Sequence, residues 1–178
     1  MSPPTDKPLG TLGFLLVTTG GLGTLRPAPG TWGSMPPVAL AGVLILLGHA
    51  ASAPGTPALI YHGTLALVLV IFSAACVIYG RPAEARFGKK DPGSVCADET
   101  AGQCIPLMLL PAAATPNLIT TAFTLAGAFV AFRIFDILKL PPANGLQRIK
   151  GGWGILLDDL VAGMQALVVV QLVTRLVM

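Results

Sequence analysis

The chain has 178 residues, of which 53% are hydrophobic and only 11% are charged, whereas a soluble globular domain carries roughly 25% charged residues. We therefore exclude an ordinary soluble enzyme and expect a membrane protein in contact with the lipid bilayer, folded as a single domain over residues 1–178. The formal charge of +3 is too small and too scattered to favour nucleic acid as a partner, and the residues specify no oligomeric state.

The N-terminal half of the chain contains three apolar runs. Residues 9–25 include five glycines, so we expect either a span or a re-entrant or interfacial helix there. Residues 35–53 and 58–79 are each long enough to cross about 30 Å of hydrocarbon as a helix. The N-terminal half therefore predicts at least two membrane-embedded helices.

The C-terminal half begins with a shorter apolar run, residues 99–114. It contains Pro106 and Pro111, which predict a kinked or partial span. Residues 117–138 and 155–178 are again long enough to cross the membrane. The whole pattern predicts an all-α, polytopic membrane helical bundle with roughly four to six membrane-embedded helices.

The loops between these runs differ in charge. Residues 54–57 and 115–116 have no charged side chain, whereas residues 80–98 and 139–154 hold seven Lys or Arg. Because cytoplasmic loops are enriched in Lys and Arg, we expect both charged loops in the cytoplasm. Arg26 falls on the same membrane face by alternation.

Five of the eight carboxylates lie where apolar segments meet this charged face. Asp98 and Glu99 open one segment, Asp158 and Asp159 lie one turn inside another, and Asp136 is near the end of a third. Acids gathered at one depth repel one another and are costly to desolvate, so we expect a cation as their counter-charge. Oxygen ligands favour Mg²⁺, Ca²⁺ or Mn²⁺. Adjacent acids on a helix are about 100° apart, so we expect one acid of each pair to bind the cation directly.

Helix capping is the simpler explanation of the two acidic pairs. Carboxylates in the first turn of a helix complement its dipole. Two such pairs together with Asp136, all on one membrane face, favour a shared site over capping because the chain has only eight acids.

Basic residues accompany the acids. Arg133, Asp136 and Lys139 recur every three residues and so share one face of a helix. A structural ion pair explains this spacing, and so does a site in which Arg133 and Lys139 bind an anionic phosphate while the aspartate binds metal. The neighbouring acids favour the second explanation.

Two glycine-rich segments precede helices. "PGTWGS" (29–34) predicts a turn at its first two residues and an N-cap at Ser34. A helix start of this kind also exposes backbone N–H groups that can hold a phosphate, which makes Gly30, Thr31 and Ser34 candidate phosphate contacts. The glycines of "GGWG" (151–154) likewise either form a simple turn or permit close approach of the backbone to a phosphate.

Several phosphatase chemistries lack their residues in this chain. No arginine lies six residues after Cys76, Cys96 or Cys104, and the spacing of these thiols fits no zinc site. No Asp-x-Asp motif is present, and His49 and His62 lie near the uncharged face. Among these phosphatase chemistries, metal-assisted attack by water is the one that the residues of this chain can support.

Four segments resemble the motif blocks of the phosphatidylglycerophosphatase A family, in the family's order. The resemblance covers most of the chain. It departs from the family at Leu140, where a proline is usual, and at Ala97, where an aromatic residue is common. The four blocks are "PGTWGS" (29–34), "DPGSVCADETAG" (91–102), "RIFDILK" (133–139) and "GGWGILLDDLVAG" (151–163).

The resemblance implies an all-helical phosphatase in the bacterial inner membrane, with its active site facing the cytoplasm. It implies that the enzyme uses Mg²⁺ to convert phosphatidylglycerophosphate to phosphatidylglycerol. The implied metal-binding and catalytic residues are Asp98, Glu99, Asp136, Asp158 and Asp159. The implied phosphate contacts are Thr31, Ser34, Arg133 and Lys139. A small membrane transporter and a non-catalytic membrane scaffold are the alternatives.

Overall fold

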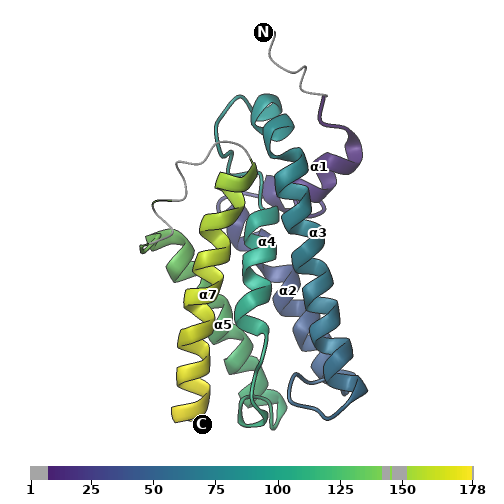
Figure 1. Cartoon of the computed structure of the whole chain (residues 1–178), viewed down its shortest axis with the longest axis vertical. Helices are drawn as coiled ribbons and strands as arrows, with labels where there is room; N and C mark the ends of the chain where they lie inside the picture. The colour runs from purple at the N-terminus through teal and green to yellow at the C-terminus, as the bar shows by residue number, and fades with distance from the viewer. Residues whose placement is uncertain (1–7, 142–144, 146–151, 178) are drawn as a thin grey trace.

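The computed structural model describes residues 8–141, 145 and 152–177, and these residues form helices, turns and loops without a β-strand. The predicted all-α fold is confirmed. Within the described ranges, four long helices build the bundle; one short helix precedes them and another lies among them (Figure 1). The helices are α1 (Thr11–Val17), α2 (Pro29–Leu46), α3 (Thr56–Phe87), α4 (Ala97–Cys104), α5 (Leu118–Leu138) and α7 (Gly152–Leu176).

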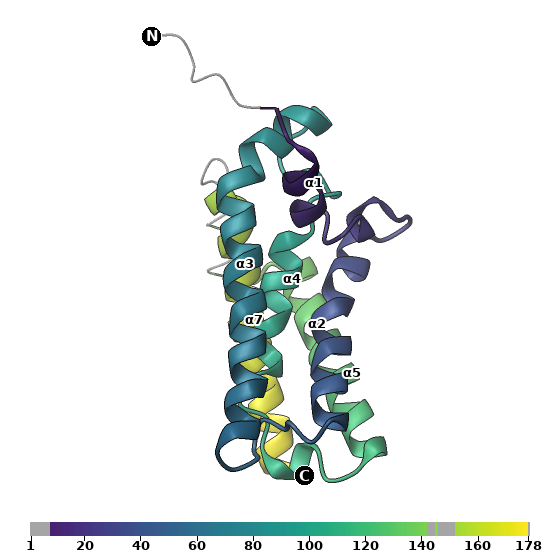
Figure 2. The same ribbon diagram turned by 90° about the vertical axis from the view of Figure 1, so that its right-hand side faces the viewer.

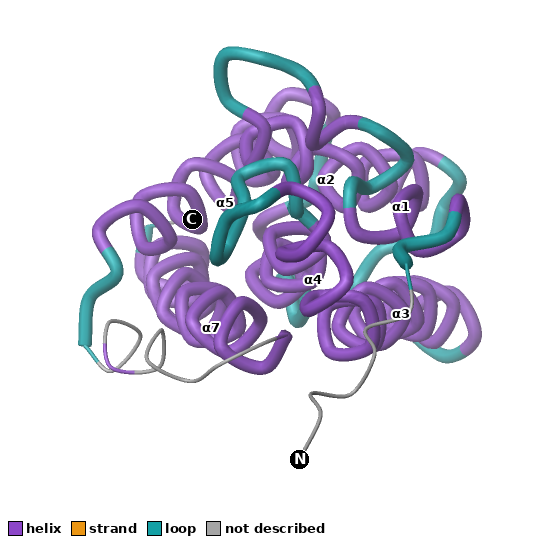
Figure 3. Tube along the Cα trace, turned by 90° about the horizontal axis from the view of Figure 1, so that it is seen from above, coloured by secondary structure: helices purple, strands orange, loops and turns teal. Residues whose placement is uncertain are grey.

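The short helix α4 lies at the centre of the bundle. Viewed from above, α2, α3, α5 and α7 surround it (Figure 3). All but one of its eight residues are buried, including polar ones. A helix buried on every side has no face turned to lipid or water, so its polar residues must find partners or ligands inside the protein.

Three helices among the described residues are long and apolar enough to cross a membrane: α3, α5 and α7. This finding corrects the prediction of four to six membrane-embedded helices. The run at residues 35–53 does not give a separate helix of that kind. Helix α2 begins earlier, so the polar "GTWGS" segment occupies its first turns, and it ends at Leu46 before a turn at Gly48, which has a φ of 86°.

The apolar runs at residues 9–25 and 99–114 both form short elements. In the first run, α1 has only seven residues and is followed by a 3-10 turn, Leu22–Thr24. Seven helical residues rise about 10 Å, too little to cross a bilayer. In the run at 99–114, α4 gives way to 3-10 turns at Ile105–Leu107 and Ala112–Ala114, so the predicted kink in this segment is confirmed.

Glycines let α7 approach α4 and α3 closely. A Cβ on Gly102 of α4 would lie 2.6 Å from the Asp159 carbonyl oxygen, and one on Gly163 would lie 2.5 Å from the Gly102 carbonyl oxygen. A Cβ on Gly80 of α3 would lie 2.7 Å from the Gly152 Cα. These contacts bring the backbone at Asp159 against α4.

Candidate metal and phosphate site

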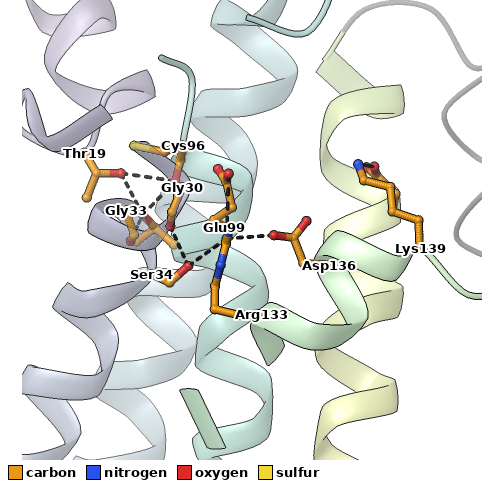
Figure 4. A network of polar contacts seen from close by, with 11 residues as sticks. Thr19, Gly30, Gly33, Ser34, Cys96, Glu99, Arg133, Asp136 and Lys139 are labelled. Atoms are coloured by element: carbon orange, nitrogen blue, oxygen red, sulfur yellow. Dashed lines mark hydrogen bonds and ion pairs between the residues drawn. The ribbon is translucent and has the colours of Figure 1, made fainter. Parts of the chain in front are cut away.

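A buried hydrogen-bond network holds the first turn of α4 (Figure 4). The Cys96 N–H donates to the Val17 carbonyl at 2.8 Å. The hydroxyl oxygens of Thr19 and Thr100 lie 2.6 Å apart, and the Thr100 hydroxyl lies 2.8 Å from the Gly33 carbonyl oxygen. The network joins α4 to the turn after α1 and to α2, and so fixes where the acidic pair of α4 lies.

The Gly33 carbonyl is available to Thr100 because of Pro37. In a regular helix this carbonyl would accept from the N–H four residues later, and proline has no N–H. Thr19 and Thr100 carry no motif of their own. The only sequence signal of their role is Pro37, which removes the usual partner of a buried carbonyl.

Three of the five predicted acids come together at the first turn of α4. One oxygen from each of Asp98, Glu99 and Asp159 lies within 4.8 Å of the others. Asp98 and Asp159 are buried, and the Glu99 side chain is 15% exposed. Asp98 Oδ1, Glu99 Oε2 and Asp159 Oδ2 are buried and accept no hydrogen bond within the described part of the chain. Such oxygens are costly to bury, so the cluster requires protons or a cation.

The two aspartates of α7 point in different directions. Asp159 belongs to the cluster, whereas Asp158 Oδ2 accepts a 2.5 Å hydrogen bond from Lys139 Nζ. Helix α7 begins at Gly152 and has no acid in its first turn, so capping explains neither aspartate. The expected divergence of adjacent acids is thus seen on α7, but not on α4, where both acids belong to the cluster.

Arg133 connects the cluster to the fifth acid, Asp136. Its Nη1 lies 2.7 Å from Asp136 Oδ2, 4.0 Å from Glu99 Oε1 and 3.4 Å from Ser34 Oγ (Figure 4). The structural ion pair between Arg133 and Asp136 is therefore present. Arg133 Nε is buried and has no acceptor among the described residues, so this N–H lacks a partner inside the protein. Lys139 ends α5 in a left-handed conformation and lies apart from this group.

The start of α2 differs from the prediction. The helix begins at Pro29 with Ala28 as its N-cap, so Ser34 lies in the second turn and is not a cap. Its hydroxyl instead donates to the Gly30 carbonyl at 2.8 Å. Proline favours this early start because its φ is already helical and its missing N–H would have no partner there.

The glycines of both segments make close contacts with neighbouring helices. A Cβ on Gly30 would overlap Glu99 Oε1, and a Cβ on Gly152 would overlap the Cys76 carbonyl oxygen. Thr31 is half-buried, and its hydroxyl has no hydrogen-bond partner in the described ranges. The structure therefore brings Gly30 and Ser34 to the site and gives Thr31 no polar contact. Residues 142–144 and 146–151 lie outside the described residues, and they include Arg148, Lys150 and Gly151 of the second segment and its loop.

Burial controls the charge of the α4 pair. Burial raises the pKa of Asp98 well above its ordinary value, and the nearby Glu99 and Asp159 carboxylates raise it further. Burial also raises the pKa of Glu99 to about 7, although a hydrogen bond with Asp98 and the charge of Arg133 oppose the shift. At Lys139, burial disfavours the charge, but the hydrogen bond to Asp158 keeps its pKa above the ordinary value. Without a cation, the α4 pair therefore retains protons close to neutral pH.

The cluster suits a hard divalent cation. Its donors are all carboxylate oxygens, and three of them are buried without another partner. Mg²⁺ is typically held by one or two carboxylates together with waters and substrate phosphate oxygens. A cation at Asp98, Glu99 and Asp159 would satisfy these oxygens, and Arg133 beside it offers a donor to a bound anion.

Fold and site together define a helical membrane protein with a buried carboxylate cluster and an arginine at one end of the bundle. Comparison with known protein families shows which family of this class the chain matches. The family described as phosphatidylglycerophosphatase A matches residues 15–174. The chain therefore belongs to the phosphatidylglycerophosphatase A family, which confirms both the resemblance of the four motif blocks and the prediction of a phosphatase enzyme.

Individual relatives agree with this assignment. The chain is 33% identical to phosphatidylglycerophosphatase A of Haemophilus influenzae over 162 residues, which cover 88% of this chain and 85% of the relative. It is 41% identical to the Escherichia coli protein of the same name over 43% of this chain and 41% of the relative. A putative phosphatidylinositol-3-phosphatase of Bacteroides thetaiotaomicron is 33% identical over 60% of this chain and 64% of its own length. No solved structure matches the chain.

Proposed function

We propose that this protein is a Mg²⁺-dependent lipid phosphatase that hydrolyses the terminal phosphomonoester of phosphatidylglycerophosphate to phosphatidylglycerol and phosphate, a step in phospholipid biosynthesis. The observation that carries the proposal is the buried cluster of Asp98, Glu99 and Asp159, whose unpartnered oxygens suit a divalent cation. Relatives named phosphatidylglycerophosphatase A support the choice of substrate.

The roles follow from the contacts of each side chain. Asp98, Glu99 and Asp159 would hold the cation, which when bound neutralises phosphoryl oxygens and lowers the pKa of an attacking water. Arg133 would bind the phosphate, with Asp136 and Ser34 fixing its guanidinium. Hydrolysis forms a bond from the water oxygen to phosphorus and breaks the bond from phosphorus to the glycerol oxygen, which leaves as an alcohol after taking up a proton.

Two of the predicted site residues would act at a greater distance. Asp158 and Lys139 form an ion pair outside the cluster, and because Asp158 precedes Asp159 on α7, this pair would orient the start of α7 so that Asp159 faces the cation. Among the remaining predicted phosphate contacts, Gly30 leaves space for the Glu99 carboxylate, and the half-buried Thr31 would face the substrate.

We further propose that the protein lies in the bacterial inner membrane with this site toward the cytoplasm. The charged end of α3, which carries Arg81 and Arg86, lies at the same end of the bundle as the start of α7 (Figure 1). Enrichment of Lys and Arg is the usual mark of a cytoplasmic face. The head group of a membrane phospholipid lies at the membrane–water interface, so it would meet the site at this end of the bundle.

Phosphate release from detergent-solubilised lipids tests the proposal. The purified protein would be assayed with phosphatidylglycerophosphate in Mg²⁺ and in EDTA, and with phosphatidylinositol 3-phosphate as the competing substrate suggested by the Bacteroides relative. We expect release that requires Mg²⁺ and favours phosphatidylglycerophosphate.

A matched pair of substitutions locates the chemistry. Glu99→Gln should abolish release, because it removes a carboxylate of the cluster, while Glu84→Gln makes the same change on α3 outside the cluster and should retain release. If the folded protein released no phosphate from either lipid with any of several divalent ions, the enzyme assignment would fail. A transporter or a scaffold would then be the function to pursue.

A further inference from the structure

An apolar groove runs between α2 and α5, which lie side by side (Figure 2). It has a volume of about 540 Å³, and every residue that lines it is apolar or aromatic. Met35 is 47% exposed and Ala126 is also exposed, so the groove opens at the surface of the bundle. We call this feature the α2–α5 groove. Its lining includes Trp32, Met35, Ala39, Ala122, Ala126 and Phe129.

The groove begins next to the acidic site. On α5, Phe129 lies four residues, or about 6 Å of helix, before Arg133. On α2, Trp32 lies in the same turn as Ser34, and the 3.4 Å contact between Ser34 Oγ and Arg133 Nη1 joins the two helices at this level. The groove thus starts about one helical turn from the guanidinium of Arg133.

From this end the groove leads away from the charged site along the bundle. A second hollow of about 350 Å³ shares Ala122 and Leu125 with it and reaches Leu46 and Leu118 at the opposite ends of α2 and α5. The second hollow is also largely apolar, with Thr115, Asn117 and Thr121 in its lining. A ligand in this position would meet carboxylates and a guanidinium at one end and the apolar groove beyond them. This is the chemistry of a lipid with a charged head group.

We infer that the α2–α5 groove binds an acyl chain of the lipid phosphate substrate, an inference that rests on the proposed function. The head group separates the terminal phosphate from the first acyl carbons, so a chain site should begin a short distance from the cation cluster, as this groove does. Once the terminal phosphate of a substrate molecule is bound, the acyl chain of the same molecule is held near the groove at a high effective concentration. Bulk lipid is not tethered to the site in this way. Alanines at positions 39, 122 and 126 leave the space that the chain would fill.

Filling the groove tests the inference by chain length. Ala126→Phe places a ring in the groove, and Ala74→Phe makes the same change at an exposed position of α3 outside it. For water-soluble substrates that differ in chain length, each methylene that enters the groove contributes roughly a fourfold change in affinity, because the chain then leaves water. We therefore expect Ala126→Phe to lower the ratio of long-chain to short-chain kcat/KM by roughly tenfold or more, and Ala74→Phe to leave that ratio unchanged. Equal ratios in the two variants would overturn the inference.

Trp32 gives a readout that does not depend on turnover. The sequence has two tryptophans, so Trp153→Phe leaves Trp32 as the only one. The probe is a phosphatidylglycerophosphate analogue with brominated chains and a phosphonate in place of the terminal ester, compared with brominated phosphatidylcholine. We expect the phosphonate analogue to quench Trp32 at lower mole fractions than brominated phosphatidylcholine, most strongly when the bromines lie near the glycerol. Ala126→Phe should weaken this quenching.

The two readouts separate the two proposals. Selective quenching of Trp32 without phosphate release would support the groove and overturn the phosphatase assignment. Phosphate release with equal quenching by both lipids would keep the phosphatase assignment and overturn the groove, because bulk lipid would then be its occupant.

Discussion

The two adjacent acidic pairs look alike in the sequence but behave differently in the fold. On α4, both Asp98 and Glu99 join the cluster, because protein surrounds this short helix on every side. On α7, which presents only part of its surface to the bundle, Asp159 faces the cluster and Asp158 pairs with Lys139. The position of a helix in the bundle thus decides whether one acid of a pair or both can bind a shared cation.

The largest effect should separate the two members of the α7 pair. We expect Asp159→Asn to lower kcat by about a thousandfold, because it removes a charged oxygen of the proposed cation site. Asp158→Asn, the same change one residue earlier, should cost less. Phosphate release by the two folded variants measures the difference, and equal losses would show that α7 offers both aspartates to the cation.

A substitution at Gly30 tests how tightly the α4 pair is enclosed. A Cβ at this position would overlap Glu99 Oε1, so Gly30→Ala should displace the carboxylate and lower kcat/KM by about a hundredfold. Gly63→Ala on α3 is the matched control, because a Cβ there meets no atom within 4 Å. Similar activity in the two variants would mean that Glu99 has no fixed place in the site.

The ion pair of Asp158 with Lys139 should have a smaller effect, about 10- to 100-fold in activity, because it acts through the position of Asp159. Asp158→Asn and Lys139→Met should each cause this loss, and the double variant should lose little more than either one. A double-mutant cycle in kcat/KM provides the measurement. Additive losses would assign the two residues to independent roles.

The smallest expected effect is on stability and concerns the α4 pair. The folded protein raises the pKa of Glu99 from 4.5 to about 7, so between these values the folded state binds more protons than the unfolded state. Without divalent ions, stability should therefore fall as pH rises through this window. We expect the Tm in EDTA to be a few degrees lower at about pH 8 than at about pH 5.

Mg²⁺ should reverse this trend, because a bound cation replaces the protons. Its effect on Tm should be larger at about pH 8 than at about pH 5. Glu99→Gln should reduce the pH dependence in EDTA, and the raised pKa of Asp98 should maintain the rest of it. A Tm in EDTA that rises with pH over the same window would contradict the protonated state of the α4 pair.

The sequence alone determined the fold class and the composition of the site. Apolar runs longer than a bilayer require helices, because backbone groups in lipid must be hydrogen-bonded within the segment. The scarcity of charge made each acid informative, and the four motif blocks identified the family before any contact was known. Pro106 and Pro111 also predicted the kink in the run at 99–114, since proline cannot continue a helix.

Only the tertiary structure decided which helices are long enough to span and which acids meet. The count of spans was too high because α2 starts at Pro29 and ends at Leu46, and a hydropathy pattern does not fix where a helix starts. The contact of Asp159 with the α4 pair depends on the close crossing of Gly102 and Gly163. The sequence carries the glycines and the acids, but the distance between them arises only when the helices pack, because contacts between distant segments are set by the whole bundle rather than by local pattern.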